Sequence, residues 1–181
     1  MGCAMIDYQA IASSIEFYQA CGFQYIEVPW MVGKPAYYET KPEGVREFST
    51  LDGFLVASGE QSFMQMLSDG SLSKGAFVCC TPCFRDEIED EIHKRFFLKV
   101  ELISVDCRDY KRLLVAAETN FIRLGAKPEV VHTTVGEDLF LNGVEVGSYG
   151  IRESSFGVFS YGTGIAEPRF SDATLLRTRT L

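Results

Sequence analysis

The sequence is poor in histidine and in basic side chains, and it has no long apolar run. Only His93 and His132 occur among the 181 residues. No stretch reaches the roughly eighteen apolar residues that a membrane-spanning helix needs. Residues 1–12 include Asp7 but no basic cluster, so the pattern of a secretory signal is missing. We therefore expect a cytoplasmic protein that does not contact a membrane.

Basic residues are outnumbered, with 17 lysines and arginines against 25 acidic residues and a formal net charge of −8. Such a balance repels the phosphate backbone of a nucleic acid unless a local basic patch compensates for it. The most basic stretch, Arg177 to Arg179 with Arg169 before it, is typical of solvated residues at a helix end. Long-range attraction to tRNA is therefore not predicted.

The few potential metal ligands and nucleophiles do not form a familiar pattern. Cys79, Cys80 and Cys83 cluster in an apolar run, and a zinc site would need a second pair of ligands at suitable spacing. The simpler interpretation is buried thiols in a strand, without disulfides because no export signal is present. No serine, cysteine and histidine arrangement of the hydrolase kind is found.

The length and the 46% hydrophobic content suit one domain over residues 1–181. Apolar spacing predicts a helix from Met5 to Cys21, followed by a strand that ends at Pro29. Glycines, prolines and charges predict a long loop over Val32–Gly53, and Gly59–Leu67 is typical of a short helix.

The second half of the chain predicts mostly strands. A hairpin is expected from Gly75–Phe84 and Phe96–Asp106, followed by a helix that Asp109 caps and Gly125 ends. Asn142-Gly143 predicts a tight turn between two further strands. Other strands are expected at Val130–Val135 and Phe156–Tyr161, the latter running through a glycine turn into a helix from about Ile165. The fold class is therefore α+β, an antiparallel β-sheet flanked by helices.

The predicted hairpin brings an arginine, a glutamate and an aromatic residue together at two strand ends. An arginine fork matches a phosphate, and a flat ring beside it can stack a nucleobase. The alternative is an ordinary solvated hairpin tip. Phe84-Arg85-x-Glu87, followed by His93, Phe97 and Glu101, resembles motif 2 of class II aminoacyl-tRNA synthetases.

The residues Phe97-x-Lys99-Val100-Glu101-Leu102 are especially similar to the seryl enzymes of that family. The motif 2 resemblance implies that Arg85 grips the α-phosphate of ATP and that Phe97 stacks on adenine. It further implies that Glu87 lies by the adenine and the amino acid, with His93 near the outer phosphates.

The segment from Gly162 to Arg169 has the glycine and arginine spacing of motif 3. The resemblance implies that Arg169 binds the γ-phosphate. Glycines also serve a strand-to-helix turn for structural reasons alone, so the pattern leaves both interpretations open. Pro168 departs from the family, which often has an acidic residue or glycine there.

The strand pair from Asp138 to Arg152 is similar to the aspartyl enzymes and to ammonia-dependent asparagine synthetase. The resemblance implies that Asp138 and Glu145 coordinate Mg²⁺ on the ATP phosphates and that Arg152 faces the amino acid. The alternatives are a solvated Asp138 and a structural salt bridge from Arg152 to Glu153 or Glu145.

Two N-terminal segments complete the resemblance. Gly22 to Pro29 looks like motif 1, which implies a homodimer. Ser58-Gly59-Glu60-Gln61 occupies the place of the loop that closes on the substrate amine, which implies that Glu60 and Gln61 contact the amino acid. Met64 stands where aspartyl enzymes carry lysine.

The resemblance implies a stand-alone ligase that uses ATP and Mg²⁺ to activate a small polar amino acid, aspartate or else serine, as its adenylate. Such a site works by positioning and charge stabilisation. The chain ends soon after Arg169, so no anticodon-binding domain is expected. The acceptor is a small molecule, a carrier protein, ammonia or tRNA. The alternatives are a non-catalytic paralogue that binds nucleotide or a partner protein, and a minimal tRNA-charging enzyme.

Overall fold

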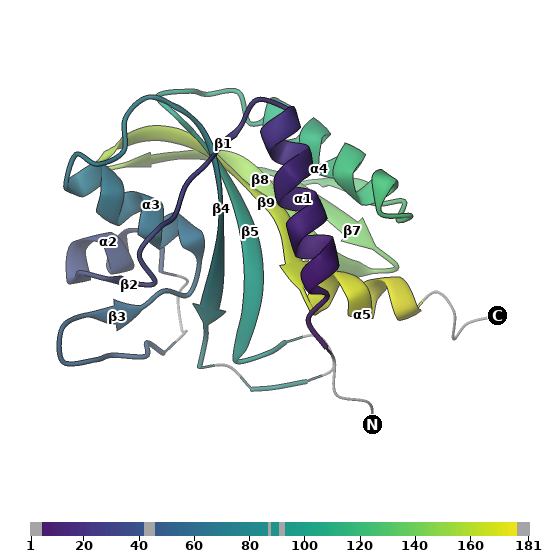
Figure 1. The fold of residues 1–181 in the computed structure, drawn as a ribbon, viewed down its shortest axis with the longest axis horizontal. Helices are drawn as coiled ribbons and strands as arrows, with labels where there is room; N and C mark the ends of the chain where they lie inside the picture. Colours follow the sequence, from purple (N-terminus) through teal and green to yellow (C-terminus); the bar gives the residue numbers. More distant parts are fainter. Residues whose placement is uncertain (1–4, 42–45, 87, 91–92, 177–181) are drawn as a thin grey trace.

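A seven-stranded sheet with helices on both faces forms the centre of the computed structural model, which describes residues 5–41, 46–86, 88–90 and 93–176 (Figure 1). All neighbouring strands run antiparallel except β1 and β4, which are parallel. In spatial order the strands are β1 (Gln24–Tyr25), β4 (Gly75–Phe84), β5 (Phe96–Val105), β9 (Gly157–Glu167), β8 (Val144–Ser154), β7 (Gly136–Leu141) and β6 (Glu129–His132). The predicted α+β class with a mainly antiparallel sheet is confirmed.

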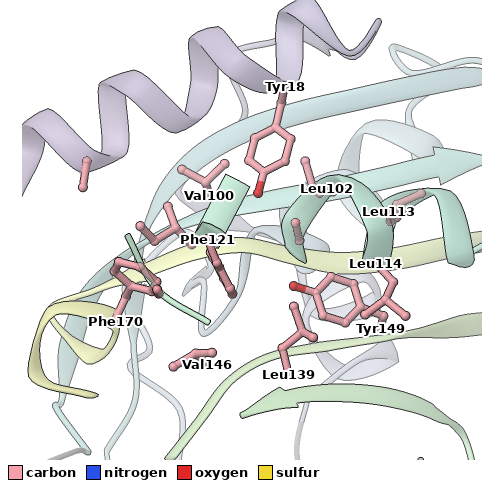
Figure 2. Close-up of a cluster of buried hydrophobic side chains, with 14 of the residues drawn as sticks. Tyr18, Val100, Leu102, Leu113, Leu114, Phe121, Leu139, Val146, Tyr149 and Phe170 are labelled. Atoms are coloured by element: carbon pink, nitrogen blue, oxygen red, sulfur yellow. The ribbon is translucent and has the colours of Figure 1, made fainter. Parts of the chain in front are cut away.

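Three helices, α1 (Tyr8–Ala20), α4 (Lys111–Arg123) and α5 (Arg169–Leu176), pack on one face of the sheet. Their apolar residues meet those of the central strands in one core, which Figure 2 shows around two buried tyrosines. The side chain of Asp7 caps α1 by accepting from the Ala10 N–H. The predicted cap of α4 is wrong, because Tyr110 holds the N-cap position and makes no side-chain cap bond.

The opposite face carries α3 (Gly59–Ser68), and α2 (Lys34–Glu39) packs against α3. A two-stranded sheet of β2 (Met31–Val32) and β3 (Phe54–Leu55) adjoins them (Figure 1). The predicted loop over Val32–Gly53 therefore contains a helix. Pro35 at the first turn favours helix, and the Gly33 N–H donates to Gln65 Oε1 at 2.9 Å. Gln65 is distant from Gly33 in the sequence, so the local composition does not reveal this hydrogen bond.

The glycines of the motif 3 pattern lie inside a strand and not in the predicted turn. Strand β9 continues to Glu167, and α5 starts only at Arg169. A Cβ at Gly164 would lie 2.8 Å from Val100 Cγ1, and one at Gly162 would lie 2.5 Å from the Tyr149 ring. These glycines therefore let large side chains lie flat against the strand.

The turn between β7 and β8 is confirmed at Asn142-Gly143. Their φ angles are 51° and 80°, the left-handed values that a two-residue hairpin turn of type I′ requires. The turn brings Glu145 back along β7, where it lies opposite Phe140.

Candidate active-site cavity

A cavity of about 260 Å³ opens on the face of the sheet that carries α3. Its walls come from strands β5, β8 and β9, from the start of α3, from the end of β4 and from the residue that follows α2. Its lining includes side chains that are polar, charged or aromatic, among them Thr40, Ser58, Glu60, Arg85, Phe97, Lys99, Glu101, Glu145, Arg152, Tyr161 and Arg169. The structure therefore brings together most of the side chains that the three sequence motifs single out.

Arg85 and Phe97 form one end of the cavity. Arg85 follows β4 and Phe97 lies opposite Cys83 on β5, so the hairpin sets them side by side. The guanidinium carbon of Arg85 lies 5.1 Å from the centroid of the Phe97 ring, and its Nε donates to the Ala57 carbonyl at 3.1 Å. A positioned guanidinium beside an aromatic face can bind a phosphate and a base together.

Lys99 and Glu101 form a buried ion pair on the floor of the cavity. Lys99 Nζ lies 2.7 Å from Glu101 Oε1, which also accepts from the Ser58 hydroxyl at 3.0 Å. Glu101 is only 4% exposed, and its Oε2 has no hydrogen-bond partner among the described residues. An unpaired buried carboxylate oxygen is unfavourable, so this atom is ready to accept from a ligand donor.

Arg152 and Glu60 form a second ion pair beside the first. Arg152 Nε donates to Glu60 Oε1 at 2.7 Å, and its guanidinium carbon lies 5.0 Å from the centroid of the Tyr161 ring. Burial raises the pKa of Glu60, and Arg152 opposes that rise. Arg152 therefore forms a salt bridge, as the alternative interpretation predicts, but its partner is Glu60. Glu153, one of the two predicted partners, pairs instead with Arg108 at 2.6 Å.

Some predicted residues do not line the cavity. Gln61 is completely buried and hydrogen-bonds to the backbone, and His93 is exposed with its Nδ1 2.7 Å from Asp90 Oδ2. Asp138 lies opposite Ser148, beside the cavity rather than in its lining. The predicted role of Glu87 falls on a residue outside the described part of the chain.

No metal centre forms from protein side chains alone within the described residues, where no group of three or more histidine, cysteine or acidic side chains could hold an ion. Cys79 and Cys83 are buried free thiols, as the simpler interpretation predicts, and burial raises the pKa of Cys83 to about 11. Mg²⁺ is commonly held by one or two carboxylates together with phosphate oxygens, and exposed Glu145 at the cavity could supply such a ligand.

The sequence motifs assign no role to several residues that line the cavity. Lys99 and Glu101 lie within the quoted seryl-like stretch, yet no role was assigned to them. The signal was present, because a lysine and a glutamate two residues apart in an otherwise apolar strand need partners when buried. Tyr161 carries no such signal, since a tyrosine in a strand is ordinary.

Solved structures with a similar fold are found, whereas neither protein-family models nor curated proteins match the sequence. The Pyrococcus horikoshii seryl-tRNA synthetase complexed with ATP matches 91% of this chain and 49% of its own, with a TM-score of 0.71 and 15% identity. The Naegleria fowleri cytoplasmic serine-tRNA ligase in complex with AMP matches 92% of this chain and 47% of its own, with a TM-score of 0.67 and 15% identity. The Desulfitobacterium hafniense pyrrolysyl-tRNA synthetase PylSc matches 95% of this chain and 68% of its own, with a TM-score of 0.71 and 14% identity.

The fold is therefore that of the class II aminoacyl-tRNA synthetase catalytic domain, as the motif resemblance implies. The chain spans about half the length of the two seryl enzymes that it matches. No helix in the described part of the chain has the length and apolar character needed to cross a bilayer.

Glu167 lies at the end of β9, two residues before Arg169. Its carboxylate accepts from the Ser171 hydroxyl at 3.0 Å, while Oε2 has no hydrogen-bond partner among the described residues. The pKa of Glu167 is raised to about 7, chiefly by burial and also by the negative charges of Asp7 and Asp172, although hydrogen bonds to Ser171 and to the Asp7 backbone lower it. The folded protein therefore binds more protons than the unfolded chain between about pH 4.5 and pH 7.

The contribution of Glu167 to stability consequently decreases as the pH rises through this interval. Glutamine removes the carboxylate that is charged at pH 8. We therefore expect Glu167→Gln to change the free energy of unfolding more favourably at pH 8 than at pH 5, and the two changes should differ by on the order of 1–3 kcal/mol. Urea unfolding of both proteins at the two pH values measures the difference. A variant whose effect is the same at pH 5 and pH 8 would contradict the assignment.

Proposed function

We propose that the protein binds ATP with Mg²⁺ and activates a small polar amino acid as its adenylate. The observation that carries the proposal is one cavity in which Arg85, Phe97 and Arg169 accompany two ion pairs, Lys99–Glu101 and Arg152–Glu60. The fold of the ATP-complexed seryl-tRNA synthetase supports it.

The arginine end of the cavity suits the nucleotide. Arg85 is held by its Nε bond to Ala57 and would bind the α-phosphate, with adenine against the Phe97 ring. Arg169, at the start of α5, would bind the outer phosphates. Bound Mg²⁺ would neutralise phosphate charge, with Glu145 as a protein ligand.

The ion-pair end of the cavity suits the amino acid. Its ammonium would donate to Glu101 Oε2, the buried oxygen that has no hydrogen-bond partner among the described residues. The charge of Arg152 is already balanced by Glu60, so an acidic substrate side chain would gain less from Arg152 than the resemblance implies. Serine is therefore the preferred substrate, and aspartate is the second choice.

The reaction would need no side-chain nucleophile. The amino acid carboxylate would attack the α-phosphorus in line, forming a carbon–oxygen–phosphorus link as pyrophosphate leaves. Arg85 would offset charge on the α-phosphoryl oxygens, and Arg169 would offset charge on the departing pyrophosphate. Catalysis would thus rest on positioning and on fixed charges.

Exchange of radiolabelled pyrophosphate into ATP, measured with each proteinogenic amino acid in turn, tests the function. We expect exchange that depends on both Mg²⁺ and one small polar amino acid, serine before aspartate. Exchange with a large apolar amino acid would show that the ion-pair end has been misinterpreted. No exchange with any amino acid, despite nucleotide binding, would favour the non-catalytic alternative.

Dimerisation and the acyl acceptor belong to the same proposal. Met5 and Tyr8 at the start of α1 are 82% and 67% exposed, which supports a homodimer through the motif 1 region and is testable by sedimentation at micromolar concentration. The net charge of −8 favours a small molecule or a carrier protein over tRNA as acceptor. The cytoplasm stays the predicted compartment.

A further inference from the structure

One wall of the active-site cavity comes from a segment that no sequence motif includes. Thr40 follows α2 directly as its C-cap residue, and it lines the cavity together with Arg85. Its hydroxyl oxygen is buried and has no hydrogen-bond partner within the described chain. The hydroxyl of Tyr37, one turn earlier and completely buried, is in the same condition. Two hydroxyl groups at this end of α2 therefore have unused hydrogen-bonding capacity.

A continuous set of hydrogen bonds joins this end of α2 to Arg85. Gln61 Nε2 donates to the Tyr37 carbonyl at 2.9 Å, and Gln61 Oε1 accepts from the Ala57 N–H at 2.7 Å. The Ala57 carbonyl in turn accepts from Arg85 Nε at 3.1 Å. Buried Gln61 thus fixes the distance between the Thr40 wall and the guanidinium without reaching the cavity itself.

Further contacts hold α2 in place at both ends. Gln65 Oε1 accepts from the Gly33 N–H at the N-terminal end. At the other end, the Glu39 carboxylate accepts from the Ser155 N–H at 2.8 Å and from its hydroxyl at 3.0 Å. Since α2 is anchored to α3 and to the β8–β9 turn, the position of Thr40 is part of the rigid fold and does not depend on a free loop.

An unpaired buried hydroxyl is unfavourable, and a ligand acceptor in the cavity would satisfy it. The group expected next to Arg85 is anionic, and a hydroxyl donates a stronger hydrogen bond to an anion than to a neutral oxygen. We propose that the Thr40 hydroxyl binds the same α-phosphate as Arg85, which makes Thr40 a second donor for nucleotide recognition. This inference rests on the proposed function and adds a contact residue to it.

Calorimetric titration with AMP and with adenosine separates the phosphate contact from binding of the base. Wild-type protein is compared with Thr40→Val, which removes the hydroxyl at similar volume, and with Thr40→Ser, which keeps it. Thr119→Val is the matched control, because Thr119 is an exposed residue on α4 whose hydroxyl donates to the Val115 carbonyl of its own helix. The urea midpoint of each ligand-free protein is measured as well.

We expect Thr40→Val to weaken AMP binding about tenfold to a hundredfold while adenosine binding changes less than about twofold. Thr40→Ser and Thr119→Val should stay within about threefold of wild type for AMP. The urea midpoint of ligand-free Thr40→Val should equal or exceed that of wild type, because the variant loses an unpaired buried hydroxyl.

Wild-type affinity of Thr40→Val for AMP would overturn the proposal and leave the nucleotide function standing. Equal losses for AMP and adenosine, together with a lower urea midpoint, would assign Thr40 a structural role and would also overturn it. If the wild-type protein binds neither AMP nor a non-hydrolysable ATP analogue, the proposed function itself falls, and this inference falls with it.

Discussion

Replacing Arg85 by alanine is expected to reduce adenylate formation at least about a hundredfold while the protein stays folded. The guanidinium lies at the cavity, where it would stabilise charge that develops on the α-phosphoryl group. Its hydrogen bond to Ala57 and its stacking on Phe97 add little to a fold built on two large apolar cores. Pyrophosphate exchange measures the activity, and circular dichroism with urea unfolding verifies the fold.

Arg112→Ala is a matched control for this experiment. Arg112 also stacks on a phenylalanine, with its guanidinium carbon 5.2 Å from the Phe23 centroid, and it also donates to a backbone carbonyl, that of Cys21. Arg112 lies on α4, on the opposite face of the sheet, and should be dispensable for exchange. Arg169→Ala should lose activity as Arg85→Ala does. Full activity in Arg85→Ala would remove the arginine from the mechanism.

Replacing Tyr149 by alanine is expected to lower the free energy of unfolding by about 3–5 kcal/mol. Tyr149 is completely buried near Leu113 and Leu114 (Figure 2). It packs against Gly162, and its hydroxyl donates to the Thr163 carbonyl at 2.6 Å. Alanine would leave a cavity between the sheet and α4 and an unpaired carbonyl in β9. Urea unfolding monitored by circular dichroism measures the loss.

Tyr149→Phe separates the two contributions. It keeps the ring and removes only the hydroxyl, so the expected loss is about 1–3 kcal/mol. If the alanine variant loses no more than the phenylalanine variant, the packing of the ring against Gly162 would not be the main source of stability. Because Thr163 on β9 lines the cavity, both variants should also weaken the proposed nucleotide binding.

The sheet could be predicted well because its signals are local. Apolar alternation marks β4 and β5, and Asn142-Gly143 marks the turn before β8. The helix α2 was not predicted because hydrogen bonds with Gln61 and Gln65 hold it in place, and these two residues lie in the next helix, α3. A local composition rich in glycine, proline and charge gives no sign of such partners.

The site could be predicted only where its residues belong to a local sequence pattern. Arg85, Phe97 and Arg169 were found because each belongs to a motif with fixed spacing. The resemblance of Ser58-Gly59-Glu60-Gln61 to the family's substrate loop implies that both Glu60 and Gln61 contact the amino acid, but helical geometry turns neighbouring side chains in different directions, and of these two only Glu60 lines the cavity. Thr40 has no signal in the sequence, since a threonine after a short helix has no pattern, and only the tertiary structure places it in the lining of the same cavity as Arg85.

The hydrogen bond from the Tyr18 hydroxyl to the Gly164 carbonyl, 2.7 Å long, also bears on how the chain folds. It joins the first helix to the last strand, and that strand lies between β5 and β8. Contacts between residues so far apart in the sequence form slowly, because most of the chain must lose conformational entropy before the contact can stabilise the fold. Residues of the same strand line the cavity, so we expect ligand binding to appear only in the final phase of refolding, after the β4–β5 hairpin has formed.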